Sequence, residues 1–178
     1  MSGSELCLAA DSGNEARAKD ILSGKPPLTL VNYRDEDGRT PLHCAAEKGH
    51  DTVVTLLLQR GAVVDSVNNA NSTPLHWAAV EGRDKVIEKL IQHGALVNSV
   101  NNSNDCPLHY AAMNGHATVV SLLIHHGAVL DSVNKSKITP LRWAAVNGHE
   151  SVVELLLKAG AHVVSRWMTD DGWVYDER

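Results

Sequence analysis

Phenylalanine is absent from this 178-residue sequence, and tryptophan and tyrosine together account for only 4% of it. A buried core must therefore be built from leucine, valine, isoleucine and alanine. Hydrophobic residues still make up 43% of the chain and charged residues 21%, as in ordinary globular proteins. The composition predicts a folded chain and argues against extensive disorder.

Cysteine is scarce as well. Cys7, Cys44 and Cys106 are odd in number, far apart and without C-x-x-C spacing. This pattern argues against a disulfide framework or a zinc site and predicts a reducing compartment, the cytoplasm or the nucleus. The sequence has no run of 18 apolar residues and no signal-peptide pattern at its start, so we expect neither membrane insertion nor secretion.

An excess of basic residues is also missing. Lys and Arg number 16 against 21 Asp and Glu, which gives a formal net charge of −5. A protein that binds the phosphate backbone needs a basic face, so we expect no nucleic-acid partner.

What the sequence does contain is an internal repeat of 33 residues. Four features keep this step: a proline, an alanine pair, a first glycine and a second glycine. In order, they stand at Pro41, Pro74, Pro107 and Pro140; at 45–46, 78–79, 111–112 and 144–145; at Gly49, Gly82, Gly115 and Gly148; and at Gly61, Gly94, Gly127 and Gly160.

The repeated segments T-P-L-H, T-P-L-H, C-P-L-H and T-P-L-R, each followed two residues later by an alanine pair, resemble the ankyrin repeat. The resemblance implies an all-α solenoid of stacked helix-turn-helix units joined by β-hairpin-like turns. We expect a degenerate N-terminal capping repeat over 1–36, regular repeats over 37–69, 70–102, 103–135 and 136–168, and an incomplete C-terminal element over 169–178.

Local chemistry supports these units independently of the family. Thr40 can cap a helix whose first residue is Pro41, where the missing N–H costs nothing. Gly49 can end that helix in the left-handed conformation. A second helix is expected from Asp51 to Gly61, with Val53, Val54, Leu57 and Leu58 on one face. One such unit is too small to bury its apolar face alone, so neighbouring units must stack.

The C-terminal segment leaves two possibilities open. Trp167, Trp173 and Tyr175 cover the open end of the stack, or the chain is a fragment of a longer protein. We favour a fragment, or an array that ends on a partial repeat.

The ten histidines invite a catalytic or metal-binding interpretation. Most of them recur at fixed repeat positions, such as His43 and His50, which favours a structural role. The sequence contains no H-E-x-x-H motif, G-x-S-x-G elbow or Walker A loop. We therefore expect no enzymatic activity, no cofactor and no metal site.

The aromatic residues suggest a binding site. The residue after each P-L-H or P-L-R is Cys44, Trp77, Tyr110 or Trp143, which the resemblance places on the concave face. We define the aromatic strip as Trp77, Val80, Tyr110, Met113, Trp143 and Val146. Trp, Tyr and Met are frequent anchors of protein interfaces. The competing interpretation, that these rings fill space between repeats, remains equally open.

The hairpin tips form a second candidate surface, with Arg39, Ser72, Asp105 and Ile138 as their last residues. From the first tip (35–39) to the fourth (134–138), the charge changes from acidic to slightly basic.

Three residues depart from the repeat pattern. Arg142 replaces the framework histidine, Cys106 replaces the capping threonine at an expected cost of up to about 1 kcal/mol, and Lys137 occupies a position that suits Gly or Asn.

We therefore predict a non-catalytic, monomeric module that binds a protein or extended peptide on its concave face. Two alternatives are a regulatory or targeting domain of a larger enzyme or channel, and an inhibitor that docks on an enzyme. The resemblance also implies that a hairpin asparagine such as Asn98 can be a hydroxylation target.

Overall fold

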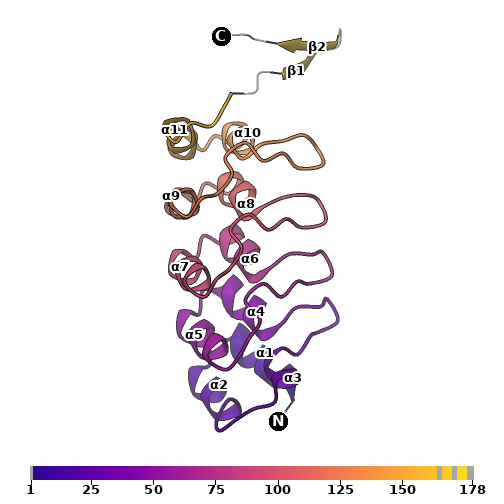
Figure 1. Ribbon diagram of the computed structural model, residues 1–178, viewed down its shortest axis with the longest axis vertical. Helices are drawn as coiled ribbons and strands as arrows, with labels where there is room; N and C mark the ends of the chain where they lie inside the picture. The colour runs from indigo at the N-terminus through magenta and orange to yellow at the C-terminus, as the bar shows by residue number, and fades with distance from the viewer. Residues whose placement is uncertain (1, 164–165, 170–171, 176–178) are drawn as a thin grey trace.

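The structure is a computed structural model that describes the backbone of residues 2–163, 166–169 and 172–175, and the side chains of residues 2–163 (Figure 1). The described residues form eleven helices and two strands. They are α1 (Gly3–Asp11), α2 (Glu15–Ile21), α3 (Leu28–Val31), α4 (Pro41–Lys48), α5 (Asp51–Gln59), α6 (Pro74–Val80), α7 (Asp84–Gln92), α8 (Pro107–Met113), α9 (Ala117–His125), α10 (Pro140–Val146), α11 (Glu150–Lys158), β1 (Arg166–Thr169) and β2 (Gly172–Tyr175).

The helices pair in sequence order, and the pairs stack into a rod. Helices α1, α4, α6, α8 and α10 form an inner column, and α2, α5, α7, α9 and α11 form an outer column. Hairpin loops project beside the inner column (Figure 1). This arrangement confirms the predicted helical solenoid.

Strands β1 and β2 form an antiparallel pair in which Arg166 faces Tyr175 and Thr169 faces Gly172. Together they make a hairpin after α11. The predicted covering role of Trp167, Trp173 and Tyr175 concerns side chains that lie outside the described part of the chain.

The inner helices α4, α6, α8 and α10 start at the cap positions that the repeat pattern predicts. Thr40 has an extended backbone, Pro41 is the first residue of α4, and the Thr40 side chain and the His43 ring form a reciprocal capping box. The helix ends at Gly49, whose φ of 81° is left-handed. The repeated T-P-L-H and Gly signals therefore fix both ends of the inner helices, as the sequence predicted.

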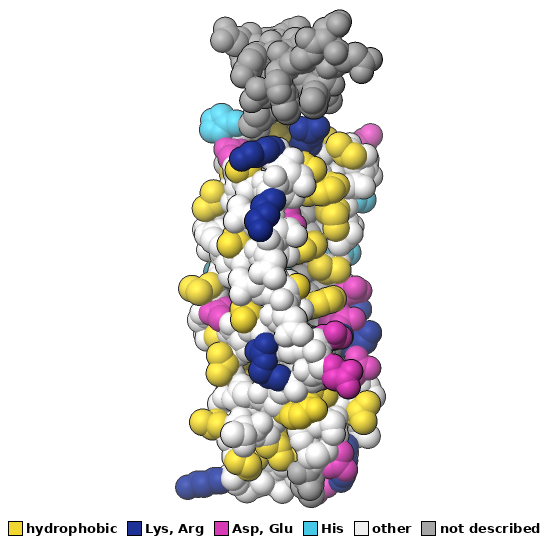
Figure 2. All heavy atoms as spheres, turned by 90° about the vertical axis from the view of Figure 1, so that its right-hand side faces the viewer, with side chains coloured by type: hydrophobic (Ala, Val, Ile, Leu, Met, Phe, Trp, Pro, Cys, Tyr) yellow, Lys and Arg dark blue, Asp and Glu magenta, His cyan; other side chains and the backbone are white. Residues whose placement is uncertain are grey.

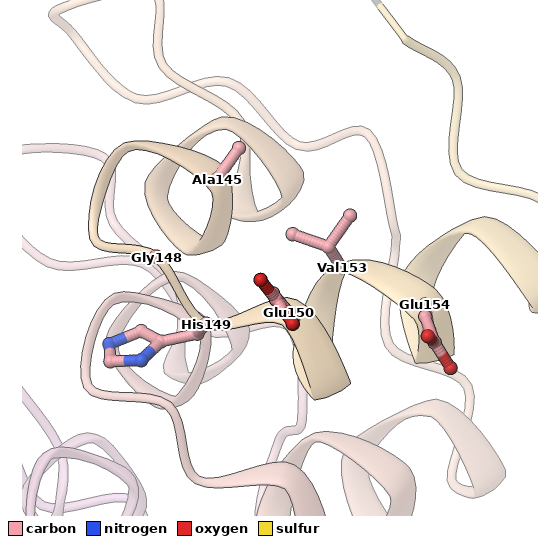
Figure 3. A pocket seen from close by; sticks show the side chains of 6 residues that line it. All are labelled: Ala145, Gly148, His149, Glu150, Val153 and Glu154. Atoms are coloured by element: carbon pink, nitrogen blue, oxygen red, sulfur yellow. The ribbon is translucent and has the colours of Figure 1, made fainter.

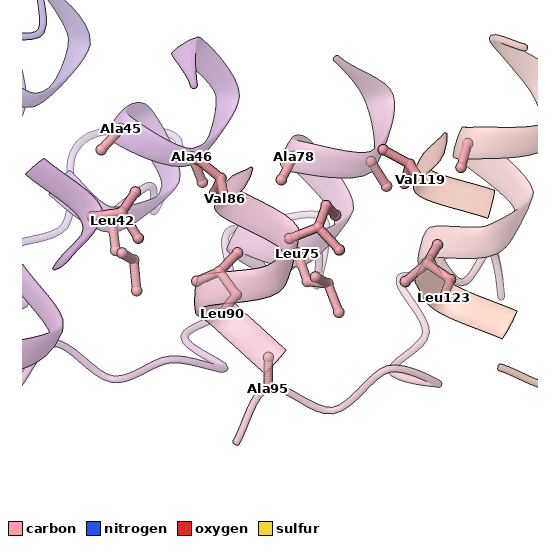
Figure 4. Packing of buried hydrophobic residues seen from close by; sticks show 14 of the residues in the cluster. Leu42, Ala45, Ala46, Leu75, Ala78, Val86, Leu90, Ala95, Val119 and Leu123 are labelled. Atoms are coloured by element: carbon pink, nitrogen blue, oxygen red, sulfur yellow. The ribbon is translucent and has the colours of Figure 1, made fainter. Parts of the chain in front are cut away.

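The core runs along the stack without interruption (Figure 4). Leu42, Leu75 and Leu108 on the inner helices are fully buried, and they pack with valines and leucines of the outer helices such as Leu90. The alanine pairs of α4, α6 and α8 are also fully buried. Since alanine has no side chain beyond Cβ, adjacent inner helices approach closely, and no large aromatic residue is needed to fill the space.

Candidate partner-binding face

The aromatic strip lies on the inner helices, on the side of the hairpins. Its three rings are half-buried, and so are Val80 and Met113. Val146 is 70% exposed. The three rings are therefore not fully buried between repeats, and each leaves part of its surface open to solvent.

Trp77 is held by a neighbouring cation. The Arg39 guanidinium carbon lies 5.0 Å from the centre of the Trp77 ring, and Arg39 also forms an ion pair with Glu47. The indole N–H of Trp77 is buried and has no hydrogen-bond partner among the described residues. The Arg39 guanidinium thus lies over the Trp77 ring, and this end of the strip is partly covered.

Tyr110 is tied to a hairpin. Its hydroxyl accepts a hydrogen bond of 2.7 Å from Asn101 Nδ2, and its ring meets the edge of His76 with centroids 6.1 Å apart. Burial raises the pKa of the Tyr110 hydroxyl. These contacts fix the ring and leave it neutral, so the exposed part of Tyr110 is a rigid apolar surface.

The apolar surface is most open toward the C-terminal repeats. Figure 2 shows hydrophobic side chains gathered along one side of the upper half of the stack, with acidic side chains below them. Among the strip residues, Val146 is the most exposed, and Trp143 and Met113 lie in the same two repeats. Glu47 in α4 and Glu81, the residue that follows α6, lie in the preceding repeats.

The hairpin tips form a hydrogen-bonded ladder. The backbone N–H groups of Asn69, Asn102 and Lys135 donate to the carbonyl groups of Asp37, Ala70 and Ser103 in the preceding hairpin, each at 2.9 Å. The tips are therefore fixed relative to one another. Glu36 and Asp37 of the first tip and the two lysines of the last are exposed on this row, whereas Asp35 is half-buried.

The last residues of the tips hold the hairpins to the helices. The carbonyl oxygens of Ser72, Asp105 and Ile138 accept from Nε2 of His43, His76 and His109 at 3.0, 3.0 and 3.1 Å. The Ser72 side chain is only 7% exposed, whereas Asp105 and Ile138 are half-buried. Of these predicted contact residues, Ser72 offers the least surface to a partner.

A second set of basic residues links successive repeats. Nε2 of His50, His116 and His149 donates to the carbonyls of Asp11, Val80 and Met113 at 3.1, 2.8 and 2.9 Å. Arg83 does the same from its Nε to the Glu47 carbonyl at 3.0 Å. The described histidines at both recurring positions thus make structural contacts, and no group of three or more His, Cys, Asp or Glu residues in the described part of the chain could hold a metal ion.

The three residues that depart from the repeat pattern differ in how far they keep the usual contacts. Cys106 keeps the cap geometry, because its Sγ lies 3.1 Å from His109 Nδ1 where the threonine hydroxyl stands in other repeats. The Arg142 side chain is exposed, and within residues 2–163 it makes none of the framework histidine contacts. Lys137 adopts a φ of 60°, as Asn71 and Asn104 do at the matching positions.

Asn98 links two repeats on the far side of the hairpin. Its Oδ1 accepts from the Val129 N–H at 2.9 Å, and its Nδ2 donates to the Gly127 carbonyl at 3.0 Å. The side chain is nevertheless exposed.

A shallow pocket of about 290 Å³ lies between α10 and α11 at the C-terminal end of the stack (Figure 3). Ala145, Gly148 and Val153 line it together with His149, Glu150 and Glu154. Ala145 is exposed, whereas its counterpart Ala112 is fully buried by the next repeat. Sequence reasoning missed this pocket, although the repeat register could have shown that this alanine faces the following unit.

A stack of helix pairs joined by a ladder of hairpins defines a helical repeat solenoid, a scaffold whose surface residues bind partners. The family model described as ankyrin repeats (3 copies) matches residues 6–101 and 95–166, so the chain belongs to the ankyrin-repeat family. None of the helices in the described residues is long and apolar enough to cross a membrane.

Several known proteins contain similar segments. The chain is 42% identical over 66 residues to transient receptor potential cation channel subfamily A member 1 of Homo sapiens, and 44% identical over 68 residues to E3 ubiquitin-protein ligase XBAT33 of Arabidopsis thaliana. It is 44% identical over 62 residues to ankyrin repeat domain-containing protein 49 of Homo sapiens. These matches cover 37%, 38% and 35% of this chain, but only 6%, 13% and 25% of the respective relatives.

Proposed function

We propose that this protein binds an extended segment of a partner protein along the aromatic strip and does so without catalysis. The observation that carries the proposal is the open apolar surface across the last two repeats, formed by Tyr110, Met113, Trp143 and Val146. Rigid aromatic rings lose little conformational entropy on binding, which makes Tyr110 and Trp143 suitable anchors.

The hairpin row supplies specificity in this proposal. The first tip carries Asp35, Glu36 and Asp37, and the fourth carries Lys135 and Lys137. Because the ladder fixes the distance between the tips, a partner with the opposite order of charges would bind in one direction. Charges at the rim of an interface act mainly on direction and association rate, so the apolar strip provides most of the affinity.

The same binding activity could serve a larger assembly. The relatives are a channel, a ubiquitin ligase and an ankyrin-repeat protein, of which this chain matches a minor part. The proposal therefore extends to two settings. The chain could act as a regulatory or targeting domain within such a protein, or it could dock on an enzyme. Three free cysteines favour a reducing compartment such as the cytoplasm or nucleus.

The test uses a displayed library of random extended peptides selected on the full chain. Selected peptides are then titrated against the wild type, Trp143→Ala and Val146→Glu by fluorescence anisotropy. We expect both variants to weaken binding by about tenfold or more, as loss of an interface anchor costs over 1 kcal/mol.

Val129→Glu is the matched control, because Val129 is 53% exposed but lies outside the strip. It should leave the affinity within about twofold of wild type, the range of surface substitutions. If Val146→Glu and Val129→Glu affect binding equally, or if no selected peptide responds to Trp143→Ala while circular dichroism shows a folded chain, the strip is not the binding site.

A further inference from the structure

Two of the three cysteines meet across the first interface of the stack. In one pair of regular repeats, the framework histidine His76 packs against Tyr110, the residue at the aromatic position of the next repeat. In the N-terminal unit, Leu8-Ala9-Ala10 aligns with Cys44-Ala45-Ala46, so Cys7 occupies the histidine position and Cys44 the aromatic position. Both members of one inter-repeat contact are therefore cysteine.

The sequence spacing agrees with this alignment. His76 and Tyr110 are separated by 34 positions and Cys7 and Cys44 by 37, and the N-terminal unit is three residues longer than the others. Helix α1, which carries Cys7, packs directly on α4, which carries Cys44.

The surroundings of the two thiols favour ionisation of Cys44 over Cys7. The neighbouring Cys7 thiol lowers the pKa of Cys44, burial opposes this shift, and the nearby positive charge of Arg39 adds to it. The neighbouring Cys44 thiol and burial raise the pKa of Cys7. Cys44 is therefore the thiol that more readily becomes a thiolate.

Accessibility differs between the two sulfur-bearing residues. Cys44 is 5% exposed, whereas Cys7 is half-buried at the edge of the stack. A large reagent cannot approach Cys44 closely, but a molecule as small as hydrogen peroxide needs only a narrow opening. The third cysteine, Cys106, is buried beside His109, and burial raises the pKa of its thiol.

We propose that Cys7 and Cys44 form a redox site that reacts with small peroxides and closes to a disulfide between α1 and α4. The Cys44 thiolate attacks one oxygen of hydrogen peroxide; the O–O bond breaks, and the leaving hydroxide takes up the thiol proton as water. The Cys7 sulfur then attacks the Cys44 sulfenic acid, and the S–O bond breaks with release of a second water. Overall, two thiols and one peroxide give one disulfide and two waters.

The disulfide would join the N-terminal unit to the first regular repeat. A terminal unit has a neighbour on one side only, so it opens more easily than internal repeats. A covalent link to α4 restricts the unfolded chain between the two cysteines and holds α1 in place. A dithiol reductant reverses the step by thiol–disulfide exchange.

The test starts from the reduced full chain without added thiol, treated with hydrogen peroxide and then alkylated. Peptide mapping by mass spectrometry should find a Cys7–Cys44 crosslink within one chain, and Cys106→Ser should form it equally well. The oxidised chain should melt about 5 °C higher than the reduced chain.

Single variants separate the two roles. In Cys7→Ser the Cys44 sulfenic acid lacks its partner, so a sulfenic-acid-specific dimedone probe, added together with denaturant after the peroxide is removed, should label Cys44. In Cys44→Ser that label and the crosslink should both be lost. The proposal is overturned if the wild type, shown to be folded by circular dichroism, forms only intermolecular disulfides, or if peroxide oxidises Cys106 before the pair.

Discussion

His43 Nε2 lies 3.0 Å from the carbonyl oxygen of Ser72, which belongs to the following hairpin. A carbonyl can only accept, so Nε2 carries the proton. The other ring nitrogen, Nδ1, accepts from the Thr40 N–H at 3.0 Å. The neutral ring therefore pairs with both the Ser72 carbonyl and the Thr40 N–H. A second proton on Nδ1 would point at the Thr40 N–H, which is itself a donor.

This geometry predicts that acid weakens the fold. Burial lowers the pKa of His43 and His76 from 6.5 to about 4, and it lowers the pKa of His109 as well. Above pH 6.5 these rings are neutral in both states. Between pH 6.5 and about 4 only the unfolded chain takes up the protons, so the free energy of unfolding falls by about 1.4 kcal/mol per pH unit for each fully shifted ring.

Urea unfolding followed by circular dichroism between pH 7 and 5 measures this loss before most carboxyl groups titrate. Histidine ring signals in NMR should show the buried rings still neutral at pH 5. A free energy of unfolding that stays constant over this interval would contradict the prediction.

A Gly→Ala substitution should destabilise the fold more at a glycine that lies under a histidine ring, such as Gly115 under His149, than at other glycines with positive φ. A Cβ on Gly115 would lie 2.6 Å from His149 Nδ1, whereas a Cβ on Gly127 meets nothing within 4 Å. Both have positive φ. Gly127→Ala should cost about 1–2 kcal/mol from the backbone alone, and Gly115→Ala should cost about 1 kcal/mol more because the His149 hydrogen bond is lost.

Denaturant titration of the two variants measures this difference. Its origin is checked in the background of His149→Ala, where no ring is displaced. There the two glycine substitutions should have similar costs, and an undiminished difference would rule out the ring contact as its cause.

Replacing Lys137 with glycine should stabilise the protein. The Lys137 φ of 60° is unfavourable for a lysine, and Asn71 and Asn104 fill the same position in other hairpins. Lys137→Gly should raise the free energy of unfolding by up to about 1 kcal/mol, less the extra freedom that glycine gives to the unfolded chain.

Lys135→Gly is the matched control, since it removes the same charge from the same hairpin at a residue without positive φ. Thermal melting compares the two variants. Equal or lower stability of Lys137→Gly relative to Lys135→Gly would show that backbone strain at Lys137 is negligible.

Much of the site could be placed from the sequence, but its exposure could not. The 33-residue step put Trp77, Tyr110 and Trp143 in one row. Whether each ring is open depends on neighbours that differ between repeats, namely Arg39 over Trp77 and Asn101 against Tyr110. Cys106 likewise departs from the capping pattern in sequence, yet its thiol keeps the contact with His109.

The sequence by itself determined the repeat unit, because caps, left-handed glycines and apolar faces are local signals that depend on a few adjacent residues. Only the tertiary structure decided which side chains meet across repeats. The placement of Cys7 opposite Cys44, on packed helices, and the exposure of Ala145 both follow from how one unit stacks on the next. Stacking depends on the packing of whole helices, and an insertion of three residues in the N-terminal unit changes the sequence offset without changing that packing.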